Sequence, residues 1–115
     1  KGAEAEKSYT IRFRVLDLWD ANGTPQVLGE AERAVIAALE GVTLAQRTPL
    51  RVERRRADLT RQRRILQLSD LAIFGNEIEL TIRAESGTYM KEFVHSDGGR
   101  TVPSVAAALG RECQV

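Results

Sequence analysis

The sequence is poor in the residues from which metal sites and membrane spans are built. It holds one cysteine and one histidine, which excludes an internal disulfide and leaves a structural zinc site short of ligands. Its longest purely apolar run, 34–39, is far too short to cross a bilayer, and the first seven residues contain no apolar core of a secretory signal. We therefore expect a cytoplasmic protein with no metal and no membrane contact, in which Cys113 is a small apolar filler.

Aromatic residues are also scarce, at 5%, but apolar residues as a whole make up 43% of the chain and charged residues 29%. This balance is typical of a folded soluble domain and argues against disorder. A chain of 115 residues can bury one modest core. We expect residues 1–115 to form a single domain.

The net charge of +1 conceals an uneven distribution along the chain. Between Gln46 and Arg64, eight arginines stand against Glu53 and Asp58, so this segment carries +6 and the remainder −5. Arginine outnumbers lysine by 14 to 3, and its planar guanidinium suits bidentate contacts with phosphate. The segment indicates a polyanionic partner, although the charge alone is explained equally well by a solvated face of a strand or helix.

Period-two alternation of apolar side chains predicts the strands. The alternation is clean over 8–15 and recurs in 78–82. The apolar residues Ile65, Leu66 and Leu68 suggest a further strand over 64–71, and a tight turn joins it to 78–82 as a hairpin. Turn-forming residues at 20–25 end the first strand, and 112–115 begins a last one. The arginine-rich segment that precedes the hairpin is predicted to be extended or irregular.

Helical spacing of apolar residues predicts a helix over 30–39. A short helix is expected over 89–95, capped by Ser86 or Thr88, and another over 103–109. Strands and helices in this order predict an α+β fold, with helices packed on a mixed, mainly antiparallel sheet.

Three short stretches occur together in an order that one enzyme family shares. They are KSY at 7–9, QRTPLRV at 46–52 followed by RRRADL at 54–59, and GTYMKEFVH at 87–95 followed by DGGRT at 97–101 and PS at 103–104. Each is weak alone, but together they cover nearly the whole chain. They resemble the archaeal and eukaryotic tRNA pseudouridine synthases that act on T-arm uridines, the Pus-ten family. The resemblance implies the C-terminal part of the pseudouridine synthase fold.

The resemblance also implies a reaction, the isomerisation of uridine to pseudouridine in tRNA. The family detaches uracil from its ribose at N1, turns the base and rejoins it through C5. Such chemistry requires the nucleotide to be flipped out of its stack into a pocket. The family uses no metal or organic cofactor for this step, so we expect no cofactor and tRNA as the partner.

Two residues match catalytic positions of the family, and a third matches a position in the uracil pocket. Tyr9 matches the tyrosine that stacks on the flipped base and helps to remove the C5 proton, and Lys91 matches the basic residue beside the catalytic aspartate. Met90 matches an aliphatic residue that lines the pocket. From the residues alone, Tyr9 is also explained as the start of an inward-facing stripe, Lys91 as a solvated charge and Met90 as a core side chain.

The resemblance further suggests which residues contact RNA. The expected contacts are Lys7, Arg47, Arg51, Arg54, Arg55, Arg56, Arg61, His95 and Arg100. Two alternatives remain open: some arginines pair with Glu53, Asp58 or other acidic side chains, and His95 has a capping or packing role.

The catalytic aspartate of the family is absent from the sequence. In the family it lies in a Gly-Arg-Glu-Asp-type motif upstream of the first strand, and no such motif occurs here. Asp58 belongs to another part of the pattern and is not a candidate nucleophile. We therefore expect the N-terminal part of the same enzyme to supply the aspartate, and this chain alone to be inactive. Two further readings are a non-catalytic RNA-binding α+β module with an arginine stripe and an interaction domain for an acidic protein.

Overall fold

The computed structural model describes residues 5–115, and its centre is a single six-stranded sheet. Residues 1–4 lie outside the described residues. They form part of the first seven residues, in which the sequence shows no secretory signal. The strand order is β5-β2-β3-β4-β1-β6, and all paired neighbours run antiparallel. The strands are β1 (Glu6–Val15), β2 (Thr43–Arg47), β3 (Thr60–Phe74), β4 (Glu77–Glu85), β5 (Thr101–Val102) and β6 (Cys113–Gln114).

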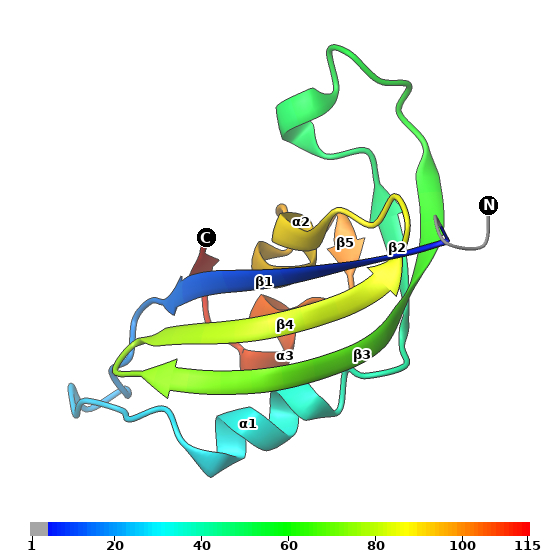
Figure 1. Cartoon of the computed structure of the whole chain (residues 1–115). Coiled ribbons are helices and arrows are strands. Elements are labelled where there is room, and N and C mark those ends of the chain that lie inside the picture. The colour runs from blue at the N-terminus through cyan, green and yellow to red at the C-terminus, as the bar shows by residue number, and fades with distance from the viewer. Residues whose placement is uncertain (1–4) are drawn as a thin grey trace.

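Three α-helices cover one side of this sheet, as Figure 1 shows. They are α1 (Glu30–Ala37), α2 (Met90–His95) and α3 (Val105–Leu109), and a 3-10 helix, η2 (Leu50–Val52), lies between β2 and β3. The predicted α+β fold with a mainly antiparallel sheet is confirmed. Within residues 5–115, none of the helices has the length and apolar character needed to cross a membrane.

The pairing of β1 with β4 shows why one face of the sheet carries helices and the other faces solvent. Phe13 and Ile78 are partners on the helix-facing side and are almost completely buried. On the opposite side Thr10 and Thr81 are partners, and their hydroxyl groups lie 2.9 Å apart in a hydrogen bond. Apolar residues on one face and polar residues on the other are the pattern expected of an antiparallel sheet with one buried face.

The β3–β4 hairpin forms where the alternating pattern predicts it, but β3 is much longer than 64–71. The turn contains Gly75, whose φ of +65° lies in the left-handed region that glycine adopts readily. The predictions missed the start of β3 at Thr60, as well as β2 and β5. These segments contain few apolar residues, and pairing with neighbouring strands holds them extended.

The short helices are capped in two different ways. The side chain of Ser104 caps the N-terminus of α3, because its hydroxyl accepts a hydrogen bond from the backbone N–H of Ala107 at 3.1 Å. The expectation that Ser86 or Thr88 caps α2 is wrong. Tyr89 occupies that position without a side-chain cap, and the Thr88 hydroxyl donates to the Glu85 carbonyl instead.

A loop at residues 48–59, which includes η2, projects from the end of the sheet between β2 and β3 (Figure 1). We call it the β2–β3 loop. It carries the middle of the arginine-rich segment, while β2 and the first residues of β3 carry the rest. The fold therefore places the positive charge at one end of the sheet.

Candidate functional site

Tyr9 lies on the helix-facing side of β1, beyond the edge of the core. Ile11, Phe13 and Val15 follow on the same face and are buried, whereas Tyr9 remains 50% exposed. Tyr9 therefore does start an inward-facing stripe, but helices do not cover its ring. The phenol is accessible to a ligand.

A hollow of about 400 Å³ opens beside Tyr9, and we call it the Tyr9 hollow. Its lining residues are Tyr9, Thr10, Ile11, Arg51, Thr88, Tyr89, Met90 and Lys91. The fold thus brings the two proposed catalytic residues and the proposed pocket residue to one site from opposite ends of the chain. A volume of this size is typical of a site for a small organic molecule.

Met90 and Lys91 reach the Tyr9 hollow from the first turn of α2. Met90 is 8% exposed and also belongs to the hydrophobic core, so it is both a core and a lining residue. Lys91 is exposed, and within residues 5–115 no carboxylate forms an ion pair with it. The hollow therefore contains an ammonium group without an acidic partner in the described part of the chain.

Arg51 borders the same hollow and is held by a carboxylate that the sequence did not single out. Glu92 is only 1% exposed, and its two oxygens accept hydrogen bonds from Arg51 at 2.7 Å and 3.3 Å. The hydrogen bond to Glu92 raises the pKa of Arg51. The guanidinium carbon also lies 5.7 Å from the centre of the Tyr89 ring, a cation–π contact. Glu92 thus positions a cation at the rim of the hollow.

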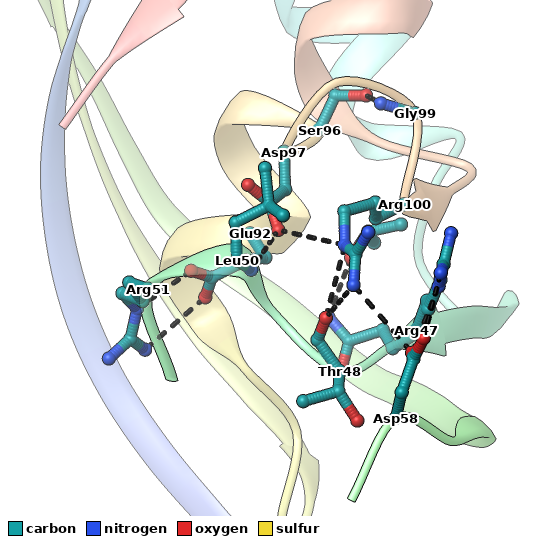
Figure 2. A network of polar contacts seen from close by, with 12 residues as sticks. Arg47, Thr48, Leu50, Arg51, Asp58, Glu92, Ser96, Asp97, Gly99 and Arg100 are labelled. Atoms are coloured by element: carbon teal, nitrogen blue, oxygen red, sulfur yellow. Dashed lines mark hydrogen bonds and ion pairs between the residues drawn. The ribbon is translucent and has the colours of Figure 1, made fainter. Parts of the chain in front are cut away.

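Further polar contacts fasten the β2–β3 loop to β2 and to the turn that follows α2 (Figure 2). Arg47 binds Asp58 with two hydrogen bonds of 2.9 Å and 2.7 Å, which lower the pKa of Asp58 and raise that of Arg47. Arg100 donates to the Thr48 carbonyl at 2.7 Å and 3.1 Å. The Asp97 carboxylate accepts from a backbone N–H of the loop at 3.0 Å. Both ends of the loop are therefore held by side-chain contacts.

The arginines separate into two groups. Arg12, Arg14, Arg33, Arg47, Arg51, Arg83 and Arg100 form ion pairs, and Arg111 donates to a backbone carbonyl. Apart from Arg111, the arginines among residues 5–115 that form no ion pair are Arg54, Arg55, Arg56, Arg61, Arg63 and Arg64. We call these six the unpaired arginines. The alternative of internal pairing therefore holds for Arg47, Arg51 and Arg100, but not for the residues between Arg54 and Arg64.

A second hollow, of about 250 Å³, opens beside the β2–β3 loop, and we call it the arginine hollow. Its lining residues are Gln46, Thr48, Arg56, Ala57, Leu59, Arg61, Arg63, Gly87 and Tyr89. Tyr89 also lines the Tyr9 hollow, so the two hollows adjoin at this residue.

Two other expected RNA contacts lie outside both hollows. Lys7 is exposed on β1 and lies two residues before Tyr9, on the same face of the strand. His95 accepts a hydrogen bond from the backbone N–H of Asp97 at 3.0 Å, and its other ring nitrogen lies 3.9 Å from a Glu92 oxygen. The structure thus gives His95 the capping role that was its alternative.

In residues 5–115, neither the single cysteine nor the acidic side chains belong to a group that could hold a metal ion. Cys113 is buried at 4% exposure on β6, as expected of an apolar filler, and burial raises the pKa of its thiol to about 11. No three His, Cys, Asp or Glu side chains in residues 5–115 come together in a group that could hold a metal ion.

Known proteins resemble this chain both in sequence and in structure. A family model described as "Pus10, C-terminal" matches residues 3–115. The tRNA pseudouridine synthase Pus10 of Thermoplasma acidophilum is 51% identical over 77 residues, which cover 67% of this chain and 20% of the relative. The same-named protein of Pyrobaculum arsenaticum is 38% identical over 112 residues, which cover 97% of this chain and 26% of the relative.

A solved structure, described as the crystal structure of a Cbf5-Nop10-Gar1 complex, has the same fold. It matches with a TM-score of 0.67 at 22% sequence identity, over 96% of this chain and 28% of that chain. This chain spans about a fifth to a quarter of the length of the two curated relatives. Since the family model matches nearly every residue, the chain belongs to the Pus10 C-terminal family.

Proposed function

We propose that this chain forms the C-terminal part of the catalytic domain of a tRNA pseudouridine synthase, which isomerises uridine to pseudouridine in the T arm of tRNA. The observation that carries the proposal is the Tyr9 hollow, in which Tyr9 and Lys91 line one site although they lie far apart in sequence. The names of the relatives support the same reaction.

Tyr9 acts on the base. Its half-exposed ring provides a flat surface on which a flipped uracil stacks. In the reaction the bond from N1 to the ribose C1′ breaks, a bond from C5 to C1′ forms, C5 loses a proton and N1 gains one. Tyr9 lines the hollow, and its hydroxyl is a group that can accept or relay the C5 proton.

Lys91 acts on the nucleophile. An ammonium group favours the ionised form of a carboxylate placed within a few ångströms, and it does so most effectively when no other carboxylate competes for it. Lys91 has no such competitor among residues 5–115. We infer that a catalytic aspartate from the N-terminal part of the same enzyme approaches the Tyr9 hollow beside Lys91.

The β2–β3 loop binds the RNA backbone. Arg54, Arg55 and Arg56 project from the loop, and Arg61 follows at the start of β3, each exposed and without an ion pair in the described residues. Such cations bind phosphates without regard to base sequence. Lys7 extends this surface on the β1 side. Arg47, Arg51 and Arg100 hold the loop in position instead.

The test is pseudouridine formation by the full-length protein on a tRNA transcript. We expect product in the T arm with the wild-type protein. Replacing Tyr9 by Phe removes only the hydroxyl, and we expect a loss of roughly a hundredfold or more in rate, the contribution of a positioned proton-transfer group. Ser8→Ala is the matched control, because Ser8 is exposed on the opposite face of β1. A fully active Tyr9→Phe variant, or a wild-type protein without product, would contradict the proposal.

A further inference from the structure

Three of the unpaired arginines face the arginine hollow. The pairing of β2 with β3 places Arg61 opposite Gln46 and Arg63 opposite Leu44, and Arg56 reaches the same hollow from the β2–β3 loop. In residues 5–115, no carboxylate forms an ion pair with any of the three. Three like charges that share one hollow repel one another unless an anion lies between them. The positive charge of the arginine hollow therefore favours the binding of an anionic ligand.

Arg63 is fixed in its place at the wall of the hollow. Its Nη1 donates to the Gln62 carbonyl at 2.8 Å, and its Nε is buried without a hydrogen-bond partner in the described part of the chain. The guanidinium packs against Gly87, where a Cβ atom would lie 3.2 Å from Nε and 3.3 Å from Nη2. Gly87 also has a φ of +91°, which side chains disfavour. Glycine at this position thus permits the close approach that holds Arg63 beside the hollow.

Two polar side chains that line the arginine hollow, Gln46 and Thr48, are already held by hydrogen bonds within the protein. The buried side-chain amide of Gln46 donates to the Tyr89 carbonyl at 2.9 Å and accepts from the Tyr89 N–H at 3.0 Å. The Thr48 hydroxyl donates to the Ala57 carbonyl at 2.6 Å and accepts from the Leu59 N–H at 3.0 Å. A site whose groups are already ordered loses little conformational entropy on binding.

We propose that the arginine hollow binds the phosphate of a nucleotide that neighbours the target uridine in the same RNA strand. This rests on the proposed function, because it takes the Tyr9 hollow as the place of the uridine. The two hollows meet at Tyr89, so an RNA strand that passes this residue reaches both. Guanidinium groups bind phosphate oxygens in a bidentate fashion. By holding the adjoining phosphate, the arginine hollow keeps the backbone in the conformation in which the uridine is flipped out.

The test combines changes in the RNA with changes in the full-length protein. The RNA is a T-arm hairpin in which one linkage at a time, on either side of the target uridine, is a methylphosphonate that lacks the phosphate charge. We expect the wild-type protein to lose roughly tenfold in affinity at one of these linkages, as for a charged hydrogen bond. The double variant Arg61→Gln/Arg63→Gln should lose the same affinity for unmodified RNA, and nothing more when that linkage is neutral.

Arg64→Gln is the matched control for this experiment. It removes the same charge from the adjacent position on β3, whose side chain points to the opposite face of the sheet. The control should retain the full tenfold sensitivity to the neutral linkage. Because Arg63 packs against Gly87, Arg61→Gln alone is measured as well, since Arg61 is exposed and its loss leaves that packing intact.

The outcomes separate this inference from the proposed function. If Arg61→Gln and the double variant respond to the neutral linkages as Arg64→Gln does, while the wild-type protein forms pseudouridine, the inference is wrong and the proposed function stands. If the wild-type protein is equally insensitive to every flanking linkage, the inference is also wrong. A wild-type protein that forms no pseudouridine in the same hairpin overturns the proposed function.

Discussion

The contact between Arg51 and Glu92 predicts an asymmetry between two single substitutions. Glu92 is 1% exposed, whereas the Arg51 side chain is 51% exposed. In Glu92→Gln, the arginine left without its partner can turn to water. In Arg51→Met, the carboxylate remains buried and has lost its strongest hydrogen-bond donor. Removing the arginine should therefore cost much more stability than removing the carboxylate, although both break the same contact.

The size of the difference follows from the burial of each group. Removing one partner of a buried ion pair costs about 3–5 kcal/mol of unfolding free energy. Because the Arg51 side chain is half exposed, we take the lower value, about 3 kcal/mol, for Arg51→Met. The Glu92→Gln change resembles loss of an exposed pair and costs about 1 kcal/mol. For a domain of this length, 1 kcal/mol corresponds to roughly 4 °C in melting temperature. We expect losses of roughly 12 °C for Arg51→Met and roughly 4 °C for Glu92→Gln.

Thermal unfolding of the 115-residue chain at neutral pH, followed by circular dichroism, measures the melting temperature of both variants. Equal losses for the two variants, or a larger loss for Glu92→Gln than for Arg51→Met, would contradict this prediction.

Three further predictions concern catalysis, RNA binding and the thiol. The 115-residue chain alone should form no pseudouridine in tRNA transcripts, since it lacks the aspartate motif; measurable product would contradict this. It should bind tRNA with an affinity that falls as salt rises, and Arg54→Gln/Arg55→Gln should reduce the slope of log K against log salt by about 1.4–1.8; an unchanged slope in binding titrations would exclude these two contacts. Burial raises the pKa of Cys113 to about 11, so an alkylating reagent should modify the thiol only after unfolding in urea. Because the unfolded chain loses this proton first, the stability that Cys113 contributes is present below the ordinary thiol pKa and is lost as pH rises toward about 11.

The sequence predicted those elements in which apolar side chains carry a clear period. β1, the β3–β4 hairpin and α1 bury alternating or helically spaced apolar residues, and all of them form. β2 and the start of β3 were missed because their inward positions include Gln46, Arg61 and Arg63 rather than apolar residues. These segments are strands because neighbouring strands pair with them, and a local pattern does not record such pairing.

The candidate site was predictable to a different extent. The family resemblance singled out Tyr9, Met90 and Lys91, and the fold brings these residues to one hollow. Glu92 was overlooked, because a charged residue next to a lysine on a short helix is usually solvated. The sequence also could not predict which arginines form ion pairs. Whether an arginine is paired depends on which acidic side chain the fold places across from it, as Asp58 is placed for Arg47.

The claim that the Tyr9 hollow holds the target uridine is tested most directly by photocrosslinking. The full-length protein is irradiated with a T-arm RNA that carries 4-thiouridine at the target position, and the linked peptide is identified by mass spectrometry. The account predicts crosslinks within 9–11 or 88–91, the two segments that line the hollow beside Arg51. Crosslinks confined to the opposite face of the sheet, around Arg12 and Arg83, would contradict it.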